Sequence, residues 1–458
     1  MLWALPFIFL GVRAQALEMT IYQDQRALIK EEAVFSLQAG ISQTPSFPVP
    51  WGFEPSSVLI SPVNPRDSAS VLEQDFFGGW TNEFQVLKNF IGKGVELREE
   101  KFPAPIKGVL LEAEDHLTAL KVKNQVYLNP KGTWILPAPP KASFQPVVSW
   151  KIRAKNSGNY RFKISYLTRD VTWGADYAAI IDSSSNLMEL QVWANLDNQS
   201  GIDFKKAHVL LVAGNPHQSL AALSGSHPLF HAMAAASRLI IEKSQNLFEY
   251  HLYPLPGFVN LGEGSVRLSI GEASGVPVEK KYLYDASNLG EDFSAYTRIS
   301  PDYGTQSQGE VRVVFKLKNS KASHLGFPLP PGKIRMYQKD KDGALEWIGS
   351  DSLPATPRNE ELHVNAGRAF DVLGRRVRMN FERGPKNTRE SFEITLTNHK
   401  KSDVVVEVIE HLYRWSKWKI ISSNQKWEKK NAQTIVFEIP VKKDSSSQID
   451  YTVDYNWK

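Results

Sequence analysis

The residue types best suited to ligand binding lie in one stretch, L-T-R-D-V-T-W-G-A-D-Y, from Leu167 to Tyr177. Arg169 and Asp176 are seven positions apart and bracket Trp173. A ligand pocket with Trp173 as its stacking wall would explain these residues, because a flat indole with flanking carboxylates suits a sugar ring. A structural ion pair that brackets Trp173 is the simpler explanation of the same residues.

Two carboxylates in one cleft would permit a different chemistry, the hydrolysis of a glycosidic bond. That reaction needs two carboxyl groups held about 5 to 9 Å apart. Asp176 and Asp371 are the acids that we name, and the sequence does not give the distance between them. We therefore predict no catalytic residue. The candidate ligand-binding residues are Arg169, Trp173, Asp176, Tyr177 and Asp371.

Other motifs with recognisable chemistry are incomplete or missing. Asp340 to Gly343 (D-K-D-G) resembles the start of a calcium loop, but Leu345 stands where that loop needs glycine, so a hairpin turn is predicted. Glu410-His411 is not followed by a second histidine at the spacing of a zinc site. The sequence contains no nucleophile elbow, phosphate loop or dinucleotide fingerprint. We predict no metal and no cofactor.

The composition sets the broad class of the protein. The 458 residues are enough for two to four domains, and 42% hydrophobic with 22% charged residues is ordinary for a folded chain. Lysine and arginine are scattered among acids and the net charge is only +5, so a nucleic-acid partner is not predicted. Zero cysteines exclude disulfides, thiolate metal sites and cysteine nucleophiles.

The first 16 residues have the pattern of a secretory signal. Leu2 to Val12 is an apolar run of 11 residues, too short to span a bilayer, and Ala14-Gln15-Ala16 supplies a small-x-small cleavage site. A buried N-terminal strand is the alternative. No later run reaches the length of a membrane helix. We expect an exported protein, in the periplasm, on the outer surface or outside the cell, without an integral membrane segment after signal cleavage.

Alternation of apolar and polar residues predicts the central strands. From Trp150 to Asp182 the aromatic and aliphatic residues recur at every second position, most clearly from Tyr160 to Tyr166. The turn residues between Asn156 and Asn159 divide this stretch. The pattern predicts a hairpin followed by a third strand.

A short motif, Leu-x-Asn, ends three of the predicted strands, at Asn198, Asn319 and Asn398. The intervals are 121 and 79 residues (319 − 198 and 398 − 319), a size typical of an immunoglobulin-like sandwich. An asparagine at this place suits a side chain that bonds the backbone of its own turn. Asn198-Gln199-Ser200 also matches the glycosylation acceptor pattern, but we predict a turn role for it.

These patterns predict a mainly β fold: a small N-terminal β-rich domain, residues 17–145, followed by two immunoglobulin-like antiparallel β-sandwich modules, residues 146–275 and 276–458, with a boundary near 274–278. A short helix is expected at 83–91 and a proline-rich linker at 137–141. One helical insertion is expected near 230–245, within 215–247, as cover for a sheet edge or as a lid or docking element.

The tryptophans near the C-terminus allow two interpretations. Trp415, Trp418 and Trp427 stand among lysines and could form an exposed basic and aromatic edge. Packing on the core, with lysine stems lying over the rings, is the interpretation we favour.

Six motifs give the chain a resemblance to a known family. They are Y-L-T-R-D-V-T-W-G-A-D-Y, N-Q-S-G-I-D-F-K-K-A-H-V-L-L-V-A-G, F-E-Y-H-L-Y-P-L-P, G-F-P-L-P-P-G-K-I-R-M-Y-Q-K-D-K-D-G, A-G-R-A-F-D-V and T-N-H-K-K-S-D-V-V-V-E-V-I-E-H-L. In this order, from about Trp150 to Trp457, they resemble the uncharacterised C-terminal domain of secreted bacterial proteins called mucoidy-inhibitor-like. The resemblance implies β-sandwiches, an envelope setting and an association with surface polysaccharide, and it supplies no catalytic residue. The long coiled coil of the usual relatives is missing here, so no role that depends on it is carried over.

We therefore expect an exported, non-catalytic β-sandwich protein that binds or organises an envelope polysaccharide or protein partner. The alternative is a glycan-acting hydrolase with carboxylates between the sandwich modules. A third possibility is a module of a larger protein assembly. A shallow binding face or an open strand edge would favour the first hypothesis, and a cleft with two suitably spaced acids would favour the second.

Overall fold

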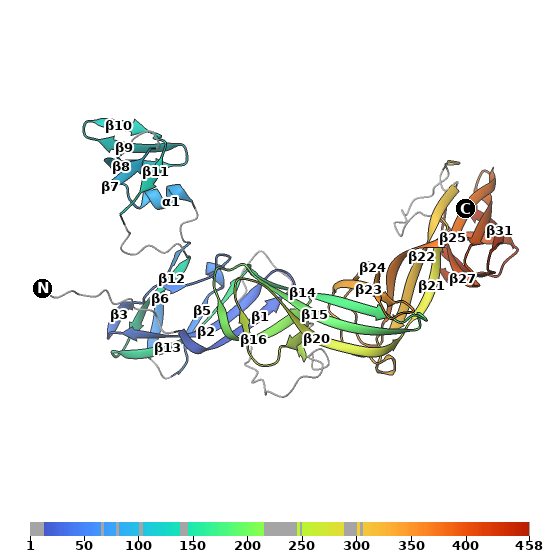
Figure 1. Ribbon diagram of the computed structural model, residues 1–458, viewed down its shortest axis with the longest axis horizontal. Coiled ribbons are helices and arrows are strands. Elements are labelled where there is room, and N and C mark those ends of the chain that lie inside the picture. The colour runs from blue at the N-terminus through green and yellow to red at the C-terminus, as the bar shows by residue number, and fades with distance from the viewer. Residues whose placement is uncertain are drawn as a thin grey trace. The chain divides into compact units, whose positions relative to one another are not determined.

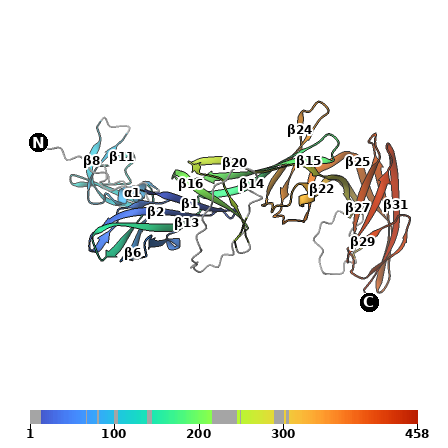
Figure 2. The same ribbon diagram turned by 90° about the horizontal axis from the view of Figure 1, so that it is seen from below.

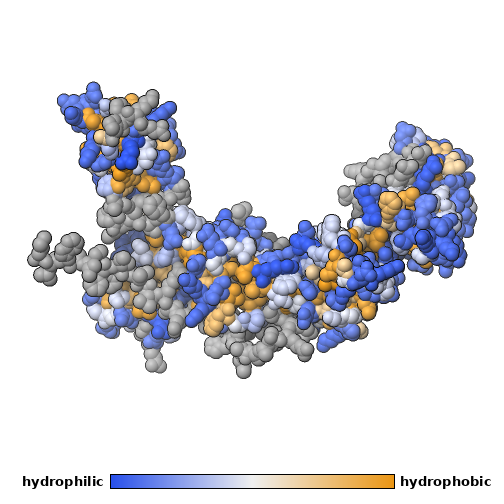
Figure 3. All heavy atoms as spheres, in the orientation of Figure 1, coloured by the Kyte–Doolittle hydropathy of each residue, from blue (hydrophilic) through white to orange (hydrophobic). Residues whose placement is uncertain are grey.

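The computed structural model describes residues 13–65, 68–78, 82–99, 104–137, 145–214, 245–247, 250–287, 300–302 and 306–457 (Figure 1). These residues form β-strands throughout, with one α-helix and short 3₁₀ turns. The predicted mainly β class is confirmed. In Figure 3 hydrophilic residues separate hydrophobic ones over the described surface that is visible, the ordinary mixture for a folded protein.

The chain divides into two compact units. The first contains the described residues up to Trp173 together with 195–214 and 250–267. The second contains 174–194, 245–246 and the described residues from 268 onward, so a few strands have residues in both units. Each unit has its own sheets and core.

The first unit is a β-sandwich. One sheet has the strand order β17-β18-β16-β1-β2-β13-β5, with β19 beside β16, and the other has β3-β12-β4 with β6 beside β12. Phe35 joins the two layers, since its ring lies 5.8 Å from both Trp150 of one sheet and Phe162 of the other. The strands are β1 (Arg13–Tyr22), β2 (Ala27–Leu37), β3 (Gly40–Gln43), β4 (Phe47–Pro48), β5 (Leu59–Pro62), β6 (Ala69–Phe77), β12 (Val147–Ala154), β13 (Gly158–Thr168), β16 (Phe204–Ala213), β17 (Gln245–Leu247), β18 (Tyr250–Pro254) and β19 (Val259–Leu261).

The predicted hairpin at the centre of the chain is wrong in one respect. β12 and β13 form as expected, but they do not pair with each other, because β12 pairs with β6 and β13 pairs with β2. The turn at 155–157 carries the chain from one layer of the sandwich to the other, so the aromatic faces of both strands point into the same core. Periodicity showed which face is buried, but pairing depends on distant strands.

A smaller sheet is inserted between β6 and β12. Its order is β10-β9-β8-β7-β11, and the helix α1 (Glu83–Lys88) contributes Leu87 to a core shared with Leu97, Leu110 and Leu120. Asn82 caps the helix by accepting a hydrogen bond from the Gln85 amide. The predicted short helix is thus confirmed, although it ends at Lys88. The strands are β7 (Gly94–Arg98), β8 (Ile106–Glu114), β9 (Leu117–Val122), β10 (Gln125–Leu128) and β11 (Thr133–Ile135).

This insertion corrects the expected N-terminal domain at 17–145. Residues 82–137 hold the small sheet, whereas β1 and β2 pair with β16 and β13 of the next expected module. The predicted boundary near 274–278 falls at the end of β20 (Gly264–Pro277), directly before β21 (Glu279–Asp285). Composition marked the loops correctly but could not show which strands return to the same sheet.

The second unit contains two sheets. The first has the order β20-β15-β14-β23-β24, and its strands are drawn side by side in Figures 1 and 2. The second is a nine-stranded sheet, β28-β31-β26-β25-β22-β21-β27-β30-β29, whose two halves meet where the rings of Phe437 and Tyr451 lie 5.8 Å apart. The strands are β14 (Val171–Ile181), β15 (Leu187–Asn198), β22 (Gln306–Lys318), β23 (Gly332–Lys339), β24 (Leu345–Leu353), β25 (Glu361–Arg383), β26 (Asn387–Asn398), β27 (Val404–His411), β28 (Trp418–Ser423), β29 (Glu428–Asn431), β30 (Thr434–Val441) and β31 (Ser445–Asn456).

One strand arrangement occurs three times. β16, β23 and β27 each lie between a parallel neighbour (β1, β14 and β21) and an antiparallel one (β19, β24 and β30). Each follows one of the three Leu-x-Asn motifs in the sequence. The motif therefore marks an internal structural repeat.

Several predictions lie at or beyond the limits of the described residues. Residues 1–12, the helical insertion near 230–245 and most of the 137–141 linker are outside them. β1 begins at Arg13, so cleavage after Ala16 would remove its first four residues and leave the register that starts at Leu17. Among the described residues, no helix combines the length and apolar character needed to cross a membrane.

Two further predictions are confirmed. Asp340 accepts hydrogen bonds from the amides of Asp342 and Ala344 and so forms the hairpin turn between β23 and β24. Trp418 and Trp427 pack against the core of the nine-stranded sheet, and the Lys429 ammonium lies 4.9 Å from the Trp418 ring centroid. Trp415 packs against the same core.

Candidate functional site

The predicted sugar-stacking residue is part of the core. Trp173 is 4% exposed, and its indole nitrogen donates a hydrogen bond to the Val212 carbonyl over 3.1 Å. The ring lies 6.3 Å from that of Tyr253. No face of this indole is open to a ligand, so the prediction of a stacking wall is wrong.

The charged residues around Trp173 each have a partner of their own. Arg169 pairs with Glu54 at 2.8 Å, and Asp176 pairs with Arg335 at 3.0 Å. The predicted ion pair between Arg169 and Asp176 is therefore not formed. Position 169 precedes β14 and position 176 lies inside it, so the two meet different neighbours.

The last two candidates, Tyr177 and Asp371, both take part in hydrogen bonds with the main chain. Tyr177 is buried and donates its hydroxyl hydrogen to the Pro330 carbonyl. Asp371 is half-buried in β25, where its carbonyl accepts a hydrogen bond from the His399 amide. Neither Asp176 nor Asp371 lines either of the two hollows described below. The five predicted residues do not form one site.

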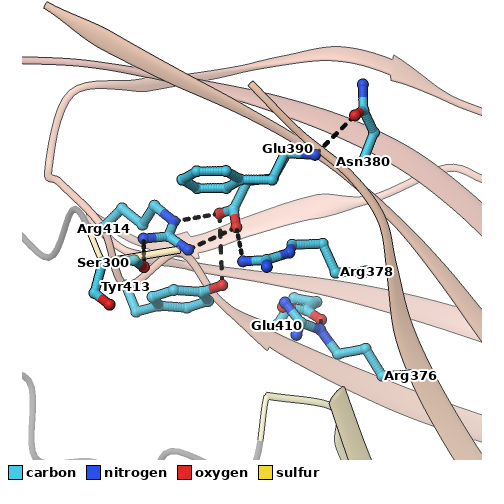
Figure 4. A network of polar contacts seen from close by, with 9 residues as sticks. Ser300, Arg376, Arg378, Asn380, Glu390, Glu410, Tyr413 and Arg414 are labelled. Atoms are coloured by element: carbon cyan, nitrogen blue, oxygen red, sulfur yellow. Dashed lines mark hydrogen bonds and ion pairs between the residues drawn. The ribbon is translucent and has the colours of Figure 1, made fainter. Parts of the chain in front are cut away.

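The densest group of charges is buried in the nine-stranded sheet (Figure 4). Arg376 pairs with Glu410, and both side chains are at most 1% exposed. Glu390 pairs with Arg414 at 2.6 Å and with Arg378 at 3.2 Å. These groups connect β25, β26 and β27 with the segment that follows β27.

Burial sets the protonation behaviour of this network. Burial alone would lower the pKa of the Arg376 guanidinium, but the Glu410 charge reverses this effect and raises it well above the ordinary value. Burial, followed by the charge of Glu390, raises the pKa of Tyr413 to about 12. Arg414 also donates to the Ser300 carbonyl over 3.0 Å. Within the described residues, the network is a set of buried charges that are paired with one another.

A second polar group beside it has the order of a catalytic triad. His411 Nε2 lies 3.6 Å from an Asp285 carboxylate oxygen, and Nδ1 lies 3.2 Å from Thr434 Oγ1. A nucleophile needs room for a reacting atom next to it. Thr434 is only 5% exposed and begins β30, which lies between β27 and β29. We interpret this group as structural.

A basic loop hollow in the described chain is open to a ligand. It has a volume of about 440 Å³ and lies in the 319–332 connection between β22 and β23. The size falls within the range of small-ligand sites. The residues that line it are Lys321, His324, Leu325, Gly326, Phe327, Pro328 and Arg358.

The loop is held in one conformation by a buried asparagine. Asn319 is fully buried, and its amide nitrogen donates to the carbonyls of Phe327, Thr356 and Pro357 over 2.8 to 3.3 Å. Its side-chain oxygen accepts from the Gly326 amide over 2.9 Å. One side chain thus joins the loop to the chain segment that carries Arg358.

Two left-handed residues complete the loop. His324 has φ of 58°, and Gly326 has φ of 94°. A side chain at position 326 would come within 2.7 Å of the Lys321 backbone, so this position requires glycine. The hydroxyl of Tyr177 holds the end of the same loop at Pro330. Tyr177, predicted as a ligand contact, is therefore a positioning residue for this loop.

Positive charge dominates the rim of the hollow. Lys321 and Arg358 are exposed, and neither forms an ion pair with another residue that the structure describes. His324 Nδ1 lies 2.9 Å from the Ser274 carbonyl and must donate, because a carbonyl only accepts. None of the residues that line the hollow is acidic. The arrangement favours an anionic ligand group and lacks the carboxylate pair of a glycosidase.

The other hollow is unsuited to binding. It has a volume of about 10 Å³ and is lined by apolar side chains, among them Tyr177, Met188 and Leu190. A void of this size holds about one water molecule, and an apolar lining leaves it dry. Among the described residues, no group of three metal-ligating side chains is present.

Comparison with known proteins gave no relative: no protein-family model matches the chain, and no curated protein matches it. The geometry of the site therefore carries the functional argument. Sequence reasoning missed Lys321, His324 and Arg358. The available signal was a lysine two positions and a histidine five positions after the Leu-x-Asn motif that ends at Asn319, while Arg358 joins them only through the fold.

Proposed function

We propose that this chain is an exported, non-catalytic β-sandwich protein of the bacterial envelope, which binds or organises a polysaccharide or protein partner through the basic loop hollow. The observation that carries this proposal is an open hollow beside a loop fixed by Asn319, lined by Lys321 and Arg358, neither of which forms an ion pair with another described residue. A preformed loop binds with a small loss of conformational entropy.

The pairing of the buried carboxylates with arginines supports a binding role over a catalytic one. The carboxylates of Glu390 and Glu410 are enclosed by arginines, and Asp176 is paired with Arg335. The signal-like N-terminus and the resemblance to the mucoidy-inhibitor-like domain support export and an envelope setting. The immunoglobulin-like character of the modules and the relation to that family are parts of the same proposal.

Binding of envelope components tests the proposal. The full chain without residues 1–16 is applied to a glycan array and to an envelope extract, beside the double variant Lys321→Ser/Arg358→Ser. We expect a captured glycan or protein that the variant does not retain. The control is Lys341→Ser/Arg375→Ser, which removes one exposed lysine and one exposed arginine from the same unit.

Two results would contradict the proposal. One is capture that is unchanged in the hollow variant. The other is release of new reducing ends from a glycan by the wild-type protein, which would establish the hydrolase alternative.

A further inference from the structure

We infer that the basic loop hollow recognises an anionic group, a carboxylate or phosphate, carried by a carbohydrate chain. This inference rests on the proposed binding function and names its ligand class. It starts from three side chains, Lys321, His324 and Arg358, which come from two segments of the chain and line one hollow.

The cations offer complementary hydrogen bonds. An arginine guanidinium binds a carboxylate or phosphate through two parallel bonds, and a lysine ammonium adds a compact charge. Within the described part of the chain, neither Lys321 nor Arg358 forms an ion pair. A bound anion therefore gains these contacts without first breaking an internal one.

The loop backbone argues against an extended peptide as the ligand. A peptide that adds a strand needs a row of free amides and carbonyls. Here the Gly326 amide and the Phe327 carbonyl are bound to Asn319, and the Leu325 amide donates to the Ser320 carbonyl. Recognition is left to side chains, which suits separate anionic groups on a sugar chain.

The neighbouring groups are compatible with this charge. The residues that line the hollow besides Lys321, His324 and Arg358 are Leu325, Gly326, Phe327 and Pro328, which bring no negative charge. Leu325, Phe327 and Pro328 are buried, so the accessible lining comes mainly from the exposed side chains of Lys321, His324 and Arg358. A volume of about 440 Å³ admits a small part of a polysaccharide rather than a whole chain.

Binding measurements with matched probes test the inference. The probes are an oligouronate, its carboxyl-reduced neutral analogue, inorganic phosphate and a poly-glutamate peptide, titrated by calorimetry against the full chain without residues 1–16. We expect the oligouronate to bind and the neutral analogue to bind at least about 10-fold more weakly. Added salt should weaken the binding of the oligouronate.

Variants assign the binding to the hollow. Lys321→Ser/Arg358→Ser should weaken oligouronate binding about 10- to 100-fold, and Arg358→Lys should retain part of it. Lys341→Ser/Arg375→Ser should have no effect. All four positions are exposed, so unchanged thermal unfolding is expected and verifies that each variant is folded.

The outcomes separate this inference from the proposed function. The inference is overturned if the neutral analogue binds as tightly as the oligouronate, or if poly-glutamate binds more tightly. If the hollow variant then fails to bind the same probe, the proposed binding function is still supported. Binding of phosphate alone identifies a free anion as the ligand and overturns the carbohydrate assignment. If the wild-type protein and the hollow variant behave alike with every probe and with envelope extract, both the inference and the proposed function are overturned.

Discussion

At the scale of single residues, three buried asparagines form the same pattern of hydrogen bonds. Asn198, Asn319 and Asn398 are all fully buried, and each donates one bond of 2.9 Å to a carbonyl of its own turn. Each also reaches two successive carbonyls on another segment of the chain, and each side-chain oxygen accepts a backbone amide hydrogen. Full burial of Asn198 leaves no access for a glycan, which confirms its turn role.

Replacing Asn319 tests the importance of this clamp for the hollow. Asn319→Ala removes the side-chain donor from the carbonyls of Phe327 and Pro357 and leaves the Thr356 carbonyl with the Leu329 amide alone. Loss of hydrogen bonds to buried polar groups is costly. We expect the free energy of unfolding to fall by about 2 to 4 kcal/mol and ligand binding at the hollow to weaken. Urea titration measures the first effect.

The exposed residue Asn156 provides the control, since only its carbonyl is used, by Tyr160. Asn156→Ala should change the free energy of unfolding by no more than about 0.5 kcal/mol. Equal stability of both variants would show that the clamp at Asn319 is unimportant.

The buried pair Arg376–Glu410 permits a second test at this scale. Arg376→Met leaves the Glu410 carboxyl buried without its cation, which should lower the free energy of unfolding by about 3 to 5 kcal/mol at pH 7. The double variant Arg376→Met/Glu410→Leu should recover most of this loss, because an apolar pair avoids the desolvation of two charges. A double-mutant cycle by urea unfolding measures both values, and a double variant as unstable as the single one would refute the account.

The sequence predicted burial at this scale better than it predicted roles. The alternating pattern that contains Trp173 and Tyr177 was correct, and both side chains lie on the inner face of β14. The residue types alone suggested a sugar site, because tryptophan, tyrosine and aspartate serve equally in cores and in pockets. Only the partners Val212, Pro330 and Arg335, all distant in sequence, decide between the two.

At the scale of elements, the hollow depends on how closely β14 and β23 approach. Ala175 of β14 is the register partner of Gly332, the first residue of β23. A Cβ atom at position 332 would come within 2.1 Å of the Ala175 carbonyl oxygen. Backbone atoms cannot give way as a flexible side chain can, so this pairing requires glycine directly after the loop.

Gly332→Ala should therefore separate the two strands and displace the loop that ends there. We expect a loss of about 1 to 3 kcal/mol in the free energy of unfolding, with weaker binding at the hollow. The control is Gly174→Ala on β14, where a Cβ atom meets nothing within 4 Å. Thermal unfolding and calorimetry compare the two, and the interpretation fails if both substitutions are equally tolerated.

The contrast between predicted strands and predicted pairing also belongs to this scale. β12, β13 and β14 all formed where alternation placed them, yet each joined a different sheet. Alternation reports burial of one face and carries no information on the neighbour at the strand edge. Pairing was set by register with β6, β2 and β23, which lie up to about 160 residues away.

At the scale of the whole molecule, the repeat explains why one motif was visible in the sequence. The buried asparagine has few substitutes that both donate and accept hydrogen bonds in the same space. The strands around it need only alternating apolar residues, so their sequences can differ freely. Spacings of 121 and 79 residues differ because the connections between repeats differ in length.

The small sheet is an insertion that the rest of the first unit does not need. The last residue of β6, Phe77, is the register partner of Val147 at the start of β12, so the chain leaves and returns at adjacent positions. The small sheet has its own core around Leu97, Leu110 and Leu120. Replacing residues 79–144 with a four-residue Gly-Ser turn would therefore join β6 and β12 as a hairpin.

We expect the shortened protein to fold with the stability of the remaining sandwich changed by no more than about 1 kcal/mol, because a short turn costs less closure entropy than a long connection. Differential scanning calorimetry should show the loss of heat absorption from the small sheet alone. Binding at the hollow, which uses residues of the other unit, should be unchanged. A shortened chain that loses cooperative unfolding would mean that the small sheet contributes to the sandwich, contrary to the strand pairing described here.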